Sequence, residues 1–188
     1  YTTSLATATI QLPVSLKYDV GIIGCMRLSG NLGVSTNMCL SSRAKSTMSQ
    51  YQWQINNYTI PSNSFVYADT ETTTAANIVN DPRGLQQVLK FFGNTVGYHS
   101  NCSVSALSFN DEGDNAVNVE SVHGAWAFAC NLSGLLHDDE NYRSSVNLAN
   151  GTTYFKFSRT STTAMLFDFY FLYEADAVIA NGVMMVDQ

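Results

Sequence analysis

The chain has 188 residues, which is enough for one domain with a substantial core. Its formal net charge is −6 with only nine Lys and Arg residues, which excludes direct nucleic-acid binding because that needs several phosphate-neutralising cations on one surface. Charged residues make up only 13% of the chain, about half the usual share, and a surface so poor in charge favours contact with other subunits. No apolar run is long enough to span a membrane, and no signal peptide is visible.

Residues 9–17 are the first clear strand, because apolar and polar residues alternate from position 10 to position 17. Pro13 cannot donate a hydrogen bond to a neighbouring strand, so we expect this strand at a sheet edge or at a break. Residues 20–28 are a second apolar strand, which two glycines interrupt, and residues 30–33 form a turn. Residues 35–49 are polar and predict a loop with a short strand.

Residues 50–55 alternate between glutamine and large apolar residues, which predicts a strand with one buried face. A turn follows at Asn56 and Asn57. Residues 60–62 close this segment, and residues 65–67 begin another short strand.

Residues 81–92 form the one predicted helix. Asp81 suits the N-cap position, Pro82 suits the first turn, and Gly93 suits the C-terminal cap. One apolar stripe at helical spacing follows from the sequence: Leu85, Val88, Leu89 and Phe92. Because this helix is inserted between strands, we expect it to cover an open end or a face of the β-structure.

Three further strands are predicted at residues 104–109, 120–132 and 153–159, with an acidic turn at residues 111–115 and a polar loop at residues 137–143. In the second of these strands, large residues share one face and alanines share the other. That division indicates a central strand, packed closely on its second face: Trp126, Phe128, Cys130 and Leu132 against Ala125, Ala127 and Ala129.

The C-terminal stretch, residues 165–186, has the most regular β pattern in the chain. Its odd positions form one continuous apolar face that needs a second sheet to cover it: Met165, Phe167, Phe169, Phe171 and Tyr173. Residues 177–180 are again apolar, and Asn181-Gly182 is the dipeptide that a two-residue hairpin prefers before residues 183–186 return.

About eight strands with Asn and Gly turns, one helix, no internal repeat and no linker predict an all-β fold. We expect an eight-stranded antiparallel jelly-roll sandwich with one short helix insertion, with residues 1–188 as a single domain. Because the chain begins at Tyr1 without an initiator Met, we expect it to be the C-terminal part of a longer chain.

The cysteine pattern favours a reducing compartment. Cys25, Cys39, Cys102 and Cys130 include no C-x-x-C pair, and Cys130 falls in an apolar run where a buried free thiol is ordinary. Four N-x-S/T sequons point weakly the other way, although they arise readily by chance in a chain rich in these residues: Asn57, Asn101, Asn131 and Asn150.

No residues emerge as catalytic, cofactor-binding or metal-binding candidates, so we expect no enzymatic activity and no cofactor. His99, His123 and His137 show none of the spacings of a zinc site. The acidic groups at residues 111–114 and 137–140 lack the ligand spacing of a calcium loop and are read as solvated turns. The nucleophile-elbow, P-loop and dinucleotide motifs are absent.

Tyr51, Trp53 and Trp126 could stack on sugars, as aromatic residues do in lectins. Their places on strand faces favour core packing instead.

Several stretches, in their order along the chain, resemble the second jelly roll of the double jelly-roll major capsid proteins. These stretches are the aromatic strand, turn and Ile-Pro-Ser of residues 51–62, the helix at 81–92, residues 126–132 followed by a polar loop and residues 144–148, and the final strand and hairpin. The family includes proteins of virophages, polinton-like viruses and large icosahedral DNA viruses and, more distantly, adenovirus hexon. The resemblance covers roughly residues 50–188. The chain departs from the family in length, since it has room for one jelly roll and the family carries two.

The resemblance implies an architectural function in a virion, with assembly inside the host cell. Such proteins form pseudo-hexagonal trimers that tile an icosahedral shell, so the expected partners are further copies of this chain in a homo-oligomer (trimer) and neighbouring capsid proteins. By analogy, residues 62–80 and 111–119 would be tower or contact loops. Two alternatives stay open, namely a single jelly-roll penton-type capsid protein and a carbohydrate-binding, lectin-like β-sandwich; an enzyme is the least favoured reading.

Overall fold

A computed structural model of the protein describes residues 1–16, 19–31, 48–66, 82–95, 109, 126–132, 147–149, 151–160, 162–173, 176–180 and 183–187. Its helices are α1 (Pro82–Thr95) and the short 3₁₀ turn η1 (Ser29–Asn31). Its strands are β1 (Thr2–Thr3), β2 (Thr7–Leu12), β3 (Asp19–Leu28), β4 (Met48–Ile55), β5 (Tyr58–Val66), β6 (Phe128–Asn131), β7 (Thr153–Arg159), β8 (Met165–Tyr173), β9 (Asp176–Ala180) and β10 (Val183–Asp187).

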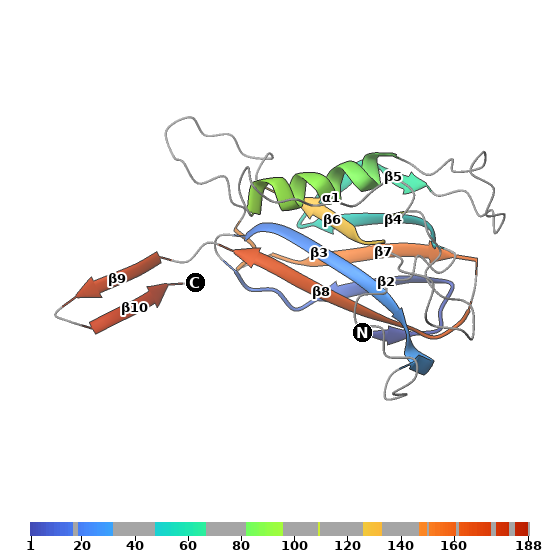
Figure 1. Ribbon diagram of the computed structural model, residues 1–188, viewed down its shortest axis with the longest axis horizontal. Helices are drawn as coiled ribbons and strands as arrows, with labels where there is room; N and C mark the ends of the chain where they lie inside the picture. The colour runs from blue at the N-terminus through green and yellow to red at the C-terminus, as the bar shows by residue number, and fades with distance from the viewer. Residues whose placement is uncertain are drawn as a thin grey trace.

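The first eight strands pair as one long antiparallel hairpin that is folded over on itself. β1 pairs with β8, β2 with β7, β3 with β6, and β4 with β5. Two more antiparallel pairs, β3 with β8 and β4 with β7, complete two four-stranded sheets of order β1-β8-β3-β6 and β2-β7-β4-β5 (Figure 1). This double Greek-key order is that of a jelly roll, so the fold class predicted from the sequence is confirmed.

The core lies between the two sheets and is mainly aromatic. β7 alternates as its sequence predicts, with Phe155 and Phe157 buried between half-buried polar residues. The Phe128 ring of β6 stacks on the Phe155 ring across the sandwich, with centroids 4.4 Å apart and planes 19° apart. Tyr51 and Trp53 of β4 contact the same two rings, at centroid distances from 4.8 to 6.0 Å. Sequence periodicity therefore identified the inward face of each of these strands.

A glycine in β3 makes room for the central ring. An added Cβ at Gly24 would overlap the Phe128 ring, whose Cζ would lie only 2.6 Å away. Gly21, on the opposite face of the same strand, lies beneath Phe91 of α1, whose Cδ2 would be 2.9 Å from an added Cβ. The two glycines thus allow close approach on both faces of β3.

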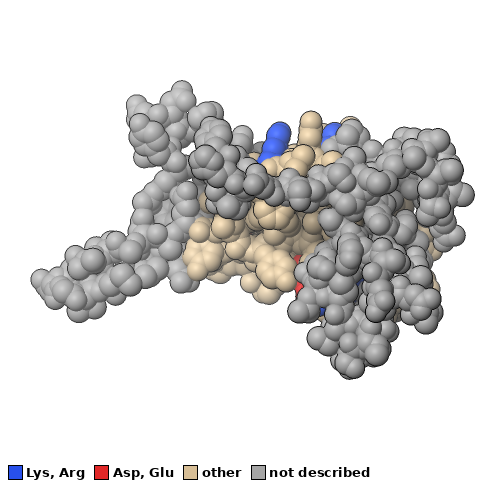
Figure 2. Space-filling view, in the orientation of Figure 1, with Lys and Arg blue, Asp and Glu red and all other residues tan. Residues whose placement is uncertain are grey.

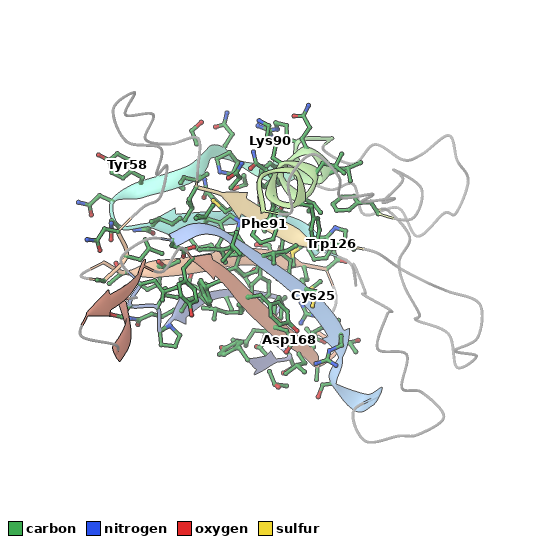
Figure 3. All side chains as sticks on the ribbon, turned by 60° about the vertical axis from the view of Figure 1, so that its left-hand side comes forward. Cys25, Tyr58, Lys90, Phe91, Trp126 and Asp168 are labelled. Atoms are coloured by element: carbon green, nitrogen blue, oxygen red, sulfur yellow. The ribbon has the colours of Figure 1, made fainter. Side chains whose placement is uncertain are left out.

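Helix α1 covers the outer face of the β6 end of its sheet, as expected for a helix inserted between strands (Figure 1). Its orientation differs from the predicted stripe, because Gly84, Val88 and Phe91 are the buried residues while Leu89 is 39% exposed. Figure 3 shows Phe91 on the side of the helix that faces the sheet. The helix also continues through Gly93 to Thr95, so Gly93 is not its cap.

Several strand predictions need correction. β6 is the last strand in its sheet order and not a central one, although its second face is closely packed, because α1 covers it. Residues 60–62 and 65–66 belong to one continuous strand, β5, which accommodates Pro61 because it is also an edge strand.

The predicted edge position of the first strand is confirmed, since β2 lies at the end of its sheet and stops before Pro13. Phe109, the one described residue of the strand expected at residues 104–109, is buried and has helical backbone. The acidic turn and the polar loop expected at residues 111–115 and 137–143 lie outside the described residues.

Both hairpins that the sequence predicts are present, with two residues between the paired strands in each. Ile55 lies opposite Tyr58, and Asn56 between them has a positive φ of 54°. Ala180 lies opposite Val183 in the β9–β10 hairpin, which leaves two residues for the turn. Figure 1 shows this second hairpin projecting from the end of β8, away from the sandwich.

Candidate assembly surface

The aromatic residues that a lectin would use lie in the core. Tyr51, Trp53 and Trp126 are each at most 1% exposed and pack against other rings, so they cannot stack on a sugar. The interpretation of these three residues as core packing is therefore confirmed.

Metal-ligating residues do not cluster in the part of the chain that the structure describes. No group of three or more His, Cys, Asp or Glu side chains in the described ranges could hold a metal ion. The three histidines and the acidic groups at 111–114 and 137–140 lie outside those ranges.

One buried carboxyl group stands at the start of β3. Asp19 is fully buried, and its Oδ1 accepts a hydrogen bond of 3.0 Å from the Gly21 N–H. Its Oδ2 finds no partner among the described residues. Burial raises the pKa of Asp19 to about 7, since the single backbone hydrogen bond offsets only part of the desolvation.

The thiol near Asp19 is chemically inert. Burial, with a smaller contribution from the Asp19 charge, raises the pKa of Cys130 to about 12. The thiol therefore stays protonated at neutral pH and is a poor nucleophile. Cys130 is a buried free cysteine, as its sequence context predicted.

A buried arginine ties the N-terminal segment to the β7–β8 corner. Arg159 donates hydrogen bonds from Nη1 to the Thr163 carbonyl at 3.0 Å and from Nη2 to the Leu5 carbonyl at 3.1 Å. Its guanidinium also lies over the Phe157 ring, 5.9 Å from the centroid. Burial lowers the pKa of Arg159, but these contacts hold the group as a structural tie. The sequence offered no sign of this role, since Arg159 reads as the polar end of a strand.

The outer face of the β1-β8-β3-β6 sheet carries few charges. Arg27 and Asp168 form an ion pair of 2.6 Å between neighbouring strands. Further along β8 on the same face, Tyr170 is 55% exposed. In Figure 2 the described surface that faces the viewer is mostly uncharged, with Lys and Arg atoms along its upper margin. Such a surface fits contact with another protein better than contact with a charged ligand.

β8 has an edge that is only partly paired. β1 covers its first residues, since Thr2 and Thr3 pair with Leu166 and Met165. Tyr1 then exchanges two hydrogen bonds with Phe167, of 2.7 and 2.9 Å. Figure 1 shows β8 continuing well past the N-terminus. Residues 169–173 on this side, which we call the open β8 edge, therefore have no neighbouring strand in the described part of the chain.

The backbone groups on the open β8 edge follow from the pairing of Phe167. In an antiparallel ladder, alternate residues direct both their N–H and C=O groups to the same side. Because Phe167 bonds to Tyr1, the same groups of Phe169, Phe171 and Tyr173 point to the unpaired side. Sequence reasoning did not find this edge. The sequence feature that could have indicated it is the run Phe-Tyr-Phe-Leu-Tyr at residues 169–173, because apolar or aromatic residues occupy both faces of this part of the strand.

Two of the four sequons fall on described residues, and their settings differ. Asn57 is exposed in the β4–β5 turn, where a glycan could attach, whereas Asn131 is half-buried in β6 and its N–H donates to Gln87 of α1.

The described part of the chain includes no helix that is long and apolar enough to cross a membrane. Comparisons with protein-family models, with curated proteins and with solved structures gave no match for this chain.

Proposed function

We propose that the protein is a structural subunit of a viral capsid, which assembles into trimers that tile an icosahedral shell. The observation that carries this proposal is the jelly-roll strand order, β1-β8-β3-β6 facing β2-β7-β4-β5. It is the arrangement that capsid domains use, and it agrees with the resemblance of residues 50–188 to the double jelly-roll family.

Two properties of the surface support assembly over ligand binding. The chain has few charged residues, and the described outer face of β3 and β8 presents the exposed Tyr170 and one ion pair. Tyrosine is enriched at protein interfaces, while most charged residues are depleted from their cores.

The lectin-like alternative has less support, because the aromatic residues on which it depended are buried. The penton-type alternative differs from the main proposal in the number of jelly rolls per chain, one rather than two, and in the symmetry of the assembly. Fivefold rather than threefold particles would identify it.

The test is the oligomeric state of the purified chain. Light scattering coupled to size-exclusion chromatography should give a trimer, and negative-stain microscopy should show particles with threefold symmetry. An obligate interface of this kind buries more than about 2,000 Å². A monomer at every concentration tested would overturn the proposal.

A further inference from the structure

The β4–β5 turn carries a glycosylation sequon that the proposed function does not use. Asn57, Tyr58 and Thr59 have the N-x-T pattern, and the middle residue is not proline. In such a sequon the side-chain amide nitrogen of the asparagine takes an oligosaccharide. Because the same pattern also arises by chance, the surroundings of each sequon decide whether it can serve.

Asn57 is free to act as an acceptor because its neighbour holds the turn together. The Asn56 N–H donates to the Thr152 carbonyl at 2.8 Å, and the Asn56 Oδ1 accepts from the Thr152 N–H at 3.1 Å. The Gln54 Nε2 donates to the Asn56 carbonyl at 3.3 Å. The Asn57 side chain makes no hydrogen bond to another described residue, and all three sequon residues are exposed. A sugar on Asn57 therefore breaks none of the bonds that fix the turn.

The second described sequon lacks this freedom. Asn131 is half-buried in β6, its N–H donates to Gln87 of α1, and Leu132 in the middle of its sequon is fully buried. An oligosaccharide is bulky and hydrated, so it fits only where the surface is open to water. At Asn131 it would have to separate α1 from β6, which makes this sequon an internal comparison for Asn57.

An exposed aromatic ring beside Asn57 offers a contact for the sugar. Tyr58 is 74% exposed, more than any other large apolar or aromatic residue in the described part of the chain. Figure 3 shows it at the margin of the molecule, away from the labelled core residues Phe91 and Trp126. The C–H groups of a pyranose ring pack on aromatic rings, and burying such surface is favourable. A sugar on Asn57 would cover apolar surface that the chain leaves in water.

The described cysteines are compatible with the oxidising compartment in which this modification takes place. Cys25 and Cys130 are both buried free thiols. Burial raises the pKa of Cys130 to about 12, so almost no reactive thiolate forms there. The cysteine pattern favoured a reducing compartment, but buried thiols of this kind would also persist unpaired in a secretory lumen.

We propose that Asn57 is an acceptor for an N-linked oligosaccharide whose first N-acetylhexosamine packs on the Tyr58 ring. The donor is an oligosaccharide linked to a lipid diphosphate. A bond forms between the Asn57 Nδ2 and C1 of the sugar, the bond from C1 to the diphosphate oxygen breaks, the lipid diphosphate leaves, and the amide nitrogen loses one proton. The β4–β5 turn belongs to a different sheet from the outer face of β3 and β8, so the modification leaves the proposed assembly surface uncovered.

Peptide mapping of the secreted chain tests the acceptor. The full-length chain is produced in eukaryotic cells behind a leader that is removed, and the folded product is treated with peptide N-glycosidase in heavy-oxygen water, which converts each modified asparagine to labelled aspartate. Label should appear at Asn57 and not at Asn131. An unlabelled Asn57 would overturn the inference, and equal labelling of Asn131 would overturn its structural basis.

Three variants of exposed residues show whether the sequon itself is recognised. Asn57→Gln and Thr59→Ala should both lose the oligosaccharide from the β4–β5 turn, although Thr59→Ala keeps the acceptor amide. Thr59→Ser restores the hydroxyl and should keep the oligosaccharide. A Thr59→Ala chain that is still modified at Asn57 would contradict acceptance through this sequon.

A comparison of stabilities tests the contact with Tyr58. The same sequence made in bacteria lacks the oligosaccharide, and its urea midpoint should lie about 0.5 M below that of the glycosylated chain. Tyr58→Ala should still be glycosylated, but its two forms should have the same midpoint. The same difference in wild type and Tyr58→Ala would overturn the packing on Tyr58, whereas the peptide map alone decides the acceptor.

Discussion

The substitution Gly24→Ala tests how closely the two sheets pack. The new Cβ would overlap the Phe128 ring, with Cζ at 2.6 Å and Cδ2 at 2.9 Å, both inside the closest approach of real Cβ atoms. Phe128 cannot move easily, because it is fully buried and contacts the rings of Tyr51, Trp53 and Phe155. Overpacking of this kind costs about 1–3 kcal/mol. With a typical urea m-value of about 2 kcal/mol/M, the unfolding midpoint should fall by about 1 M.

The cause can be isolated with a double-mutant cycle. Phe128→Leu removes the Cε2 and Cζ atoms that the new methyl group would meet, so it should relieve the overlap at Gly24. The double variant should be more stable than the sum of the two single effects predicts, by about 1 kcal/mol or more. Gly30→Ala is the matched control, because nothing lies within 4 Å of its added Cβ. Urea unfolding, monitored by tryptophan fluorescence, gives the unfolding free energies of the wild type, the two single variants and the double variant. Strict additivity, or a Gly24→Ala variant as stable as Gly30→Ala, would refute the packing argument.

Three more predictions concern single sites. The folded-state pKa of Asp19 is raised from 3.8 to about 7, so its carboxyl destabilises the protein as pH rises from about 4 to about 7, by an amount on the order of 4 kcal/mol. In urea titrations, the free energy of unfolding of Asp19→Asn should therefore rise relative to that of the wild type across this pH window. A difference between the two free energies that stays constant from pH 4 to pH 8 would show that Asp19 ionises normally. Asn56→Ala should cost about 1–2 kcal/mol more than Asn56→Gly in thermal unfolding, because both variants lose the 3.1 Å bond that Oδ1 accepts from the Thr152 N–H and only alanine is strained at the positive φ of this position; equal losses would argue against this reasoning. Val88→Ala should cost about 2 kcal/mol and Leu89→Ala less than about 0.5 kcal/mol, since only Val88 is buried against the sheet; a loss of urea midpoint for Leu89→Ala as large as that for Val88→Ala would support the helix stripe that the sequence predicted.

Local patterns explain most of what could be predicted. The alternation in residues 153–159 and 165–173 identified β7 and β8 almost to the residue, because a strand's inward face follows from period two alone. The Asn56-Asn57 turn was also predictable, because a turn of this kind is determined by two adjacent residues.

The candidate assembly surface was less accessible to such reasoning. Whether a strand edge is paired depends on distant segments of the chain, as the pairing of Thr2 and Thr3 with Leu166 and Met165 shows. The apolar residues of the hairpin do not show what covers it, because composition does not distinguish a strand covered by its own chain from one that another chain covers.

The sequence by itself determined the class of fold, the inward faces of the main strands and the position of the helix along the chain, since each depends on residues a few positions apart. The tertiary structure decided the order of strands in the two sheets, the edge position of β6 and the burial of Asp19 and Arg159. It also decided that the hairpin extends away from β8. These features depend on which distant segments meet, and that choice is made by the packing of the whole sandwich rather than by any local pattern.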